Sequence, residues 1–250
     1  MKAVGVSDIG KCRKNNEDAI FVPSSTDDIQ NLFIVADGMG GCNAGEVASG
    51  YAIESFLQYI RMERDIHSQE DIPDLLTEAM VLANKAVYDK SNSQREFAEM
   101  GTTMVAAAIQ DGKLFVTYAG DSRAYLFRDK ELRPLTTDHS FVMELVKLGS
   151  ITREEAATHP KRNIITRAVG IKETIEVDTI VEKVTKGDIL LLCTDGLSGA
   201  LSDQDMAEVI GKRVKLEKKA QRLIEMANER GGYDNISLIL VDVGGKAECC

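Results

Sequence analysis

Three short apolar runs follow one another in the middle of the chain with very little sequence between them. They cover residues 104–109, 114–119 and 124–127. Only Gln110–Lys113, read as QDGK, separates the first two, and Asp-Gly between apolar runs predicts a hairpin because glycine accepts the positive φ of a type I′ turn. Strands that adjoin without an intervening helix do not suit a doubly wound parallel sheet. We therefore expect an antiparallel sheet with helices packed outside it.

Other segments complete this expected α+β pattern. Residues 32–36, 189–193 and 236–243 are also strand-like, whereas residues 44–60, 72–90 and 215–230 place apolar side chains at three- and four-residue spacing, as amphipathic helices do. No Pro/Gly/Ser-rich linker interrupts the chain. We expect one domain over residues 1–244 and a short flexible tail over residues 245–250.

The composition excludes several classes of function. The 250 residues carry a formal net charge of −10, which disfavours a general nucleic-acid-binding surface. Five cysteines and three histidines show no zinc-type spacing, and a reducing compartment suits them best. The start of the chain lacks the apolar segment of a signal peptide, and no apolar run is long enough to span a membrane. We expect a cytoplasmic protein without membrane insertion, and nothing demands more than a monomer.

Carboxylates recur at the ends of the predicted strands. Asp37, Asp121 and Asp195 each follow an apolar run, and further acidic residues stand just before two others, namely Glu17, Asp18 and Asp234. Gathering such charges is unfavourable unless a cation lies between them. Mg²⁺ and Mn²⁺ prefer oxygen ligands, and a glycine after an aspartate lets a backbone carbonyl approach an ion closely. The pattern therefore favours a divalent-metal site, provided that these side chains converge.

Simpler interpretations remain open for each residue taken alone. A single Asp-Gly is most often a turn, and Asp234–Asn235 would serve equally well as an Asx-turn. Asp121 would pair with Arg123, two residues further along. Only the convergence of the whole set distinguishes a metal site from a series of ordinary strand ends.

Seven motifs in order resemble those of one known family, the PPM (type 2C) metal-dependent serine/threonine protein phosphatases, and in particular its short bacterial branch. The matching segments are SDIGKCRKNNEDA, VADGMGG, GTTMVAA, AGDSRAYL, NIITRAVG, LLLCTDGL and DNISLILV. The resemblance covers nearly the whole chain, and the ordered set is far more specific than any one motif.

The resemblance implies a central antiparallel β-sandwich flanked by helices on both sides, in four layers, with two metal ions at one edge. By position, Asp37 would bridge two Mn²⁺ or Mg²⁺ ions and the Gly38 carbonyl would bind one of them. Asp195 and Asp234 would hold the other ion, and Asp121 is associated with a possible third. Arg13 would clamp the substrate phosphate. Glu17, Asp18 and Asn235 would lie around the direct ligands and act through waters or as supports.

The implied reaction is hydrolysis of phosphoserine and phosphothreonine in proteins, reversing the output of a bacterial serine/threonine kinase. Two cations turn a shared water into a hydroxide near neutral pH, which attacks phosphorus. Many relatives have a histidine after the Asp-Gly that is thought to protonate the leaving group, but this chain has Met39. A metal-bound water is our preferred acid. His139 and His159 are weaker candidates, since a lone loop histidine is usually solvated.

Residues 138–170 are expected to form an insertion between sheet segments, which the resemblance identifies as a mobile flap beside the active site. His159, Lys161 and Arg162 are its candidate substrate contacts, although solvated surface charge explains each of them equally simply. We expect Arg167 to order the base of the flap and not to touch substrate. Two rival hypotheses are an inactive relative that binds phosphoproteins without turnover and a structural cation-binding protein.

Overall fold

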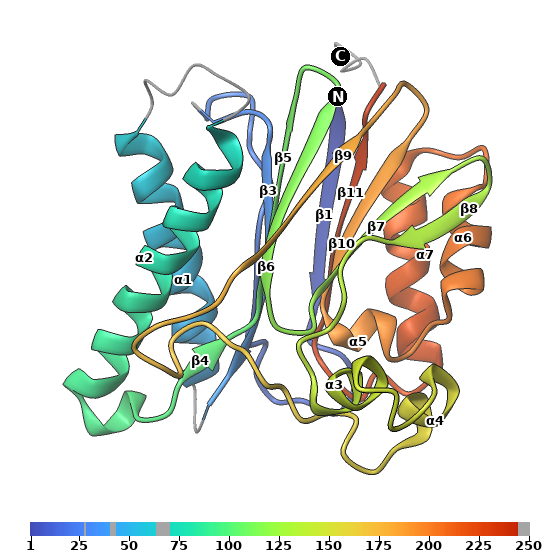
Figure 1. Ribbon diagram of the computed structural model, residues 1–250. Coiled ribbons are helices and arrows are strands. Elements are labelled where there is room, and N and C mark those ends of the chain that lie inside the picture. Colours follow the sequence, from blue (N-terminus) through green and yellow to red (C-terminus); the bar gives the residue numbers. More distant parts are fainter. Residues whose placement is uncertain (28, 41–43, 64–70, 245–250) are drawn as a thin grey trace.

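Two antiparallel β-sheets lie face to face in the computed structural model, with helices covering the outer side of each (Figure 1). The structure describes residues 1–27, 29–40, 44–63 and 71–244. The four layers, helix, sheet, sheet and helix, confirm the predicted α+β sandwich. The expected tail over residues 245–250 lies outside the described residues.

Every strand pairing in the two sheets is antiparallel. The first sheet has five strands in the order β1 (Lys2–Asp8), β11 (Ile236–Asp242), β10 (Ile189–Cys193), β7 (Arg123–Arg128) and β8 (Glu131–Pro134). The second has β2 (Asp18–Phe21), β3 (Leu32–Met39), β5 (Met104–Gln110), β6 (Lys113–Ala119) and β9 (Asp178–Lys183), with the short β4 (Gly101–Thr102) paired to β3. The strand β1 therefore lies beside β11, so that the first and last strands share a sheet.

The predicted hairpin joins β5 to β6. Gln110 is the partner of Lys113, and the two residues between them, Asp111 and Gly112, have φ of 47° and 75°. Positive φ at both central positions is the signature of a type I′ turn, whose twist matches that of the flanking strands. The local sequence therefore sets the register of this pair.

Helices on each outer face bury their apolar stripes against a sheet. On one side lie α1 (Ala44–Met62) and α2 (Ile72–Ser93), followed by a short 3₁₀ turn at Arg95–Phe97; on the other lie α5 (Asp195–Ser198), α6 (Asp203–Ile210) and α7 (Leu216–Glu229). The three- and four-residue spacing predicted over residues 215–230 is confirmed in α7, where five apolar residues on one face are buried: Leu216, Ala220, Leu223, Ile224 and Ala227.

A third apolar cluster fills the space between the sheets. Phe33 and Val35 from β3 meet Leu190 and Leu192 from β10, and the residues between them in sequence point outward to the helices. Because side chains alternate along a strand, a strand covered on both faces is an unbroken apolar run. This explains why the central strands are continuous apolar segments in the sequence.

The segment over residues 138–170 contains two short helices, α3 (Phe141–Lys147) and α4 (Arg153–Thr158), at one end of the sandwich (Figure 1). Each begins at a hydroxyl cap: Ser140 accepts from the Met143 N–H, and Thr152 forms a reciprocal capping box with Glu155. In the described part of the chain, no helix combines the length and apolarity that crossing a membrane requires.

Candidate active site

The strand ends that carry carboxylates meet at the same end of the sandwich as α3 and α4 (Figure 1). The strands β3, β6 and β10 finish there, whereas β2 and β11 begin there, because neighbouring strands run in opposite directions. Asp37 on β3 is the direct cross-strand partner of Asp18 on β2. Like charges placed directly opposite one another destabilise a sheet. Because this pairing lowers the stability of the fold, it indicates that the two carboxylates are kept for a functional site.

Asp37 lies at the centre of this group. Burial raises its pKa well above the ordinary value, and the charges of Asp18, Asp195, Asp121 and Asp234 raise it further, in that order. The pKa of Asp195 is also raised, first by burial and then by Asp234. Asp37, Asp195 and Asp234 therefore belong to one cluster and do not point to separate patches of surface.

Two further aspartates have pKa values near neutrality. Burial raises the pKa of Asp18 to about 7, against hydrogen bonds that lower it, and raises that of Asp121 to about 7, aided by Asp195. The Thr194 hydroxyl donates to Oδ2 of Asp18 at 3.0 Å, but Oδ1 is buried with no protein partner. A buried carboxylate oxygen without a donor is costly and is suited to bind a cation.

Arg13 lies beside the cluster, as the resemblance implied. Its Nη2 donates to Oδ2 of Asp234 at 2.8 Å, and its side chain is about half exposed. Partial burial works against its charged form, yet Asp234, Glu17 and Asp37 raise its pKa overall. Burial also raises the pKa of Glu17, which Arg13 opposes. The guanidinium is therefore placed to meet an anion that enters the acidic cluster.

Glycines follow two of these aspartates because backbone from elsewhere occupies the space of a side chain. A Cβ on Gly38 would lie 2.1 Å from the Gly45 carbonyl oxygen and 2.4 Å from that of Glu17. A Cβ on Gly196 would lie 1.9 Å from the Asn235 carbonyl oxygen. Close backbone packing thus accounts for both glycines before any ion is considered.

Asn235 joins the two loops that carry Arg13, Glu17 and Asp234. Its Oδ1 accepts from the Glu17 N–H at 2.8 Å, and its Nδ2 donates to the carbonyls of Ile9 and Asn15 at 2.9 Å each. The side chain is buried and fully used by the protein. This contact pattern suits the supporting role expected for it.

A buried hydroxyl network behind the cluster was missed by the sequence analysis. The Asp37 N–H donates to Thr103 Oγ1 at 3.2 Å, and Thr103 Oγ1 lies 2.7 Å from Ser122 Oγ. Thr103 therefore links the main chain of Asp37 to the residue after Asp121. The GTTMV motif was the available signal, although its threonines resemble ordinary strand residues.

The oxygen atoms of the clustered aspartates are chemically suited to bind a hard divalent cation. Within residues 1–27, 29–40, 44–63 and 71–244, no three acidic, histidine or cysteine side chains are close enough to form a ready-made metal-binding group. The carboxylates are nevertheless near enough to raise one another's pKa values. Carboxylate oxygens with raised pKa values and the unpartnered Oδ1 of Asp18 match the preference of Mg²⁺ and Mn²⁺ for oxygen.

The simpler interpretation of Asp121 as a partner of Arg123 is wrong. Arg123 Nε and Nη2 each donate to Asp138 at 2.7 Å, and Nη1 donates to the Tyr125 hydroxyl at 3.0 Å. This bidentate pair directs the guanidinium to Asp138, and Arg123 acts on Asp121 only through its charge, which lowers the pKa of that carboxyl. Asp121 therefore stays in the acidic cluster.

The expectation that His139 is solvated is also wrong. Its ring is 8% exposed, is stacked 4.9 Å from Tyr118, and accepts at Nδ1 from the Gly120 N–H at 3.1 Å. Nε2 lies 3.3 Å from Asp178 Oδ2. Burial lowers its pKa, against the carboxylate. Nδ1 is used by the main chain and Nε2 is buried without a hydrogen bond, near Asp178, so neither ring nitrogen is accessible to a leaving group.

The three flap candidates lie in one turn after α4, where the Arg162 N–H donates to the His159 carbonyl at 3.1 Å. His159 ends α4 and accepts at Nδ1 from the Lys161 N–H at 3.1 Å, and the Lys161 Nζ lies 5.3 Å over the Phe141 ring. Arg162 instead lines a cavity of about 350 Å³ that also contains Asp121 and Asp195. Of the three, only Arg162 shares a cavity with the acidic cluster.

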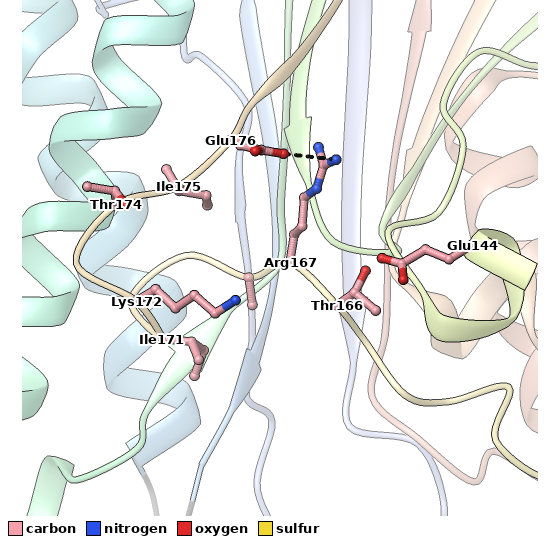
Figure 2. Close-up of a pocket in the computed structure, with 9 residues that line it drawn as sticks. Glu144, Thr166, Arg167, Ile171, Lys172, Thr174, Ile175 and Glu176 are labelled. Carbon is pink, nitrogen blue, oxygen red and sulfur yellow. Dashed lines mark ion pairs between the residues drawn. The ribbon is translucent and has the colours of Figure 1, made fainter. Parts of the chain in front are cut away.

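Arg167 lies at the base of the same segment (Figure 2). It donates to Asp178 at 3.0 Å and pairs with Glu176 at 3.1 Å. It lines a different cavity, of about 530 Å³, which contains none of the clustered carboxylates and in which Lys172 and Glu144 face the same space (Figure 2). The contacts agree with a role in ordering the base of the flap.

An acidic cluster of hard oxygen donors beside an arginine suits an enzyme that handles phosphate groups with divalent cations. Comparison with known proteins then identifies the family. The family described as Protein phosphatase 2C matches residues 10–235. The chain therefore belongs to the protein phosphatase 2C family, and it is a phosphatase, as the motifs predicted.

Individual relatives agree along nearly the whole chain. The serine/threonine phosphatase stp of Listeria monocytogenes serotype 4b (strain F2365) is 39% identical over 236 residues, 94% of this chain and 93% of that protein. The serine/threonine phosphatase PstP/Ppp of Mycobacterium tuberculosis matches with a TM-score of 0.88 and 36% identity over 98% of this chain and 99% of that one. The catalytic domain of PstP in complex with two manganese ions matches with a TM-score of 0.83 and 35% identity, over 96% and 97%.

Proposed function

We propose that this protein hydrolyses phosphoserine and phosphothreonine in other proteins, in a reaction that depends on two Mn²⁺ or Mg²⁺ ions. The observation that carries the proposal is the convergence of five aspartates beside Arg13. Four of them raise the pKa of the fifth, Asp37. The manganese ions of the PstP structure support the choice of metal.

The residues that would hold the ions are Asp37 and the Gly38 carbonyl, with Asp195 and Asp234 on the second ion and Asp121 on a possible third. When bound, the cations would supply a nucleophile from a shared water near neutral pH and neutralise charge on the phosphoryl oxygens. They would also remove the repulsion that raises the pKa values of Asp18, Asp37 and Asp121. An acidic protein can then admit a phosphate dianion.

The protein's own groups bind and orient the substrate. Arg13 presents a planar fork that matches two phosphate oxygens. It is already drawn to this place by Asp234, so little reorganisation is needed when phosphate enters. Glu17 and Asn235 fix the loop that carries Arg13, since the Asn235 amide joins Glu17 to Asn15. The side chain of Met39 has no proton to donate, so a water molecule in the site would protonate the leaving group.

The remaining features complete the proposal. Residues 1–244 form one catalytic domain, and residues 138–170 serve as a flap whose Arg162 approaches the substrate beside Asp195. The protein acts as a cytoplasmic monomer and opposes a serine/threonine kinase. Its similarity to bacterial serine/threonine phosphatases along nearly the whole chain supports the catalytic part of this proposal.

The test is hydrolysis of a small aryl phosphate and of a phosphothreonine peptide, with Mn²⁺ or with a chelator. We expect turnover only with metal, and its loss in Asp37→Asn and Asp195→Asn, both checked for folding by circular dichroism. Normal turnover in either variant would contradict the two-metal arrangement. Tight binding of the phosphopeptide without any turnover would favour the inactive phosphoprotein-binding relative.

A further inference from the structure

The cavity of about 350 Å³ at the acidic cluster is lined by charged side chains of both signs. Asp121 and Asp195 line it from the sandwich, and Arg153 and Arg162 line it from the segment that carries α3 and α4. The mechanism proposed above uses the two aspartates and treats Arg162 as a general substrate contact. It gives Arg153 no role, and the sequence analysis did not single that residue out.

Both arginines are available to a ligand. Both side chains are exposed, and neither makes a hydrogen bond or an ion pair with a residue that the structure describes, although the charge of Arg153 helps to lower the pKa of the adjacent Glu154. The third arginine of the cavity, Arg123, is held by Asp138. Glu155, which stands near Arg153 in α4, accepts from the Thr152 N–H at 2.7 Å as part of the helix cap.

The protein carries a net charge of −10, yet two arginines without an ion pair line the cavity that contains Asp121 and Asp195. Metal ions would mask the charge of Asp121 and Asp195, but they would not mask that of the two arginines. Two guanidiniums there attract an anionic group, and each offers the planar fork that binds carboxylate or phosphate.

We propose that Arg153 and Arg162 recognise a second anionic group on the substrate, near the residue that is dephosphorylated. This inference rests on the proposed phosphatase function. Because these arginines line the same cavity as Asp121 and Asp195, the second group lies close in sequence to the phosphorylated residue, at about 3.4 Å per residue in an extended peptide. Its chemistry is a phosphate or a carboxylate.

Matched peptides test the inference. Each contains one phosphothreonine and, two or three residues away on either side, an alanine, a glutamate or a non-hydrolysable phosphonate. We expect the wild-type enzyme to show a kcat/KM about fivefold higher for the acid-flanked peptides than for the alanine peptide, as one exposed charge pair allows, and to lose that preference at high salt. A larger preference for phosphonate than for glutamate assigns the cavity to a second phosphate; equal preference assigns it to any acidic group.

The readout is the ratio of kcat/KM values within each variant, so a change in overall activity cancels. The ratio should fall to about one in the Arg153→Ala/Arg162→Ala double variant, to about half its value in Arg153→Ala, and should survive in Arg153→Lys. Arg213→Ala is the matched control, since Arg213 is exposed, lies between α6 and α7, and lines no part of this cavity. Its ratio should equal that of the wild type.

Equal kcat/KM for all peptides in the wild type would overturn the inference, and so would a preference that the double variant retains. Hydrolysis of the aryl phosphate, which has no flanking group, reports on the proposed function separately. If no substrate were hydrolysed, the affinities of the same peptides, measured by fluorescence anisotropy, would still decide whether the arginines select an acidic neighbour.

Discussion

Replacing Asp121 by asparagine should make the metal-free protein more stable at neutral and alkaline pH. The pKa of this buried side chain is about 7, against an ordinary 3.8, because burial and the charge of Asp195 oppose its ionisation. A difference of one pKa unit corresponds to about 1.4 kcal/mol, so the ionised form costs the fold about 4 kcal/mol. The carboxamide has nearly the same shape and carries no charge.

The sign follows from which state holds the proton. Between about pH 4 and pH 7 the folded protein keeps the Asp121 proton while the unfolded chain has lost it, so the stability of the wild type falls as the pH rises. The asparagine variant lacks this fall. Its advantage should be about 1.5 kcal/mol at about pH 5 and about 4 kcal/mol at about pH 8.

The assay is urea unfolding followed by circular dichroism, in the presence of a chelator, at both pH values. Asp188→Asn is the control, because Asp188 is also largely inaccessible to solvent but two hydrogen bonds from Arg128 lower its pKa. That variant should be less stable than the wild type at both pH values. Equal stability of Asp121→Asn and the wild type at about pH 8, or a difference that ignores pH, would refute the reasoning.

Three further variants test other contacts. Arg13→Ala should raise KM about tenfold with little change in kcat, because the residue mainly binds ground-state phosphate; steady-state kinetics showing a large fall in kcat at unchanged KM would contradict this. Thr103→Val keeps the shape but removes the hydroxyl that accepts from Asp37, so it should cost about 1–2 kcal/mol in urea unfolding and lower kcat; unchanged values of both would exclude a positioning role. Gly38→Ala should lower the free energy of unfolding by about 3 kcal/mol or more, since its Cβ would overlap backbone, whereas Gly50→Ala in α1 meets no atom within 4 Å and should raise it by about 0.5–1 kcal/mol; similar effects of the two would show that the crowding at Gly38 is unimportant.

Features set by neighbouring residues were predictable from the sequence. The β5–β6 hairpin follows from Asp111–Gly112, and the inner face of α7 follows from its spacing, because both depend on backbone geometry over a few residues. The resemblance to the phosphatase family further predicted the order of the four layers. Features set by distant partners could not be predicted in this way. His139 is the clearest example, because this loop residue is buried against Tyr118 of β6 and Asp178 of β9.

The sequence by itself determined that carboxylates stand at the ends of apolar strands and that glycines follow two of them. Only the tertiary structure decided that β2, β3, β6, β10 and β11 bring those carboxylates to one end of the molecule, where Asp18 faces Asp37 across a strand pair. The reason is that strand order and direction arise from pairings between residues far apart in the chain. The same distant packing raises the pKa values and leaves Arg153 facing the cavity.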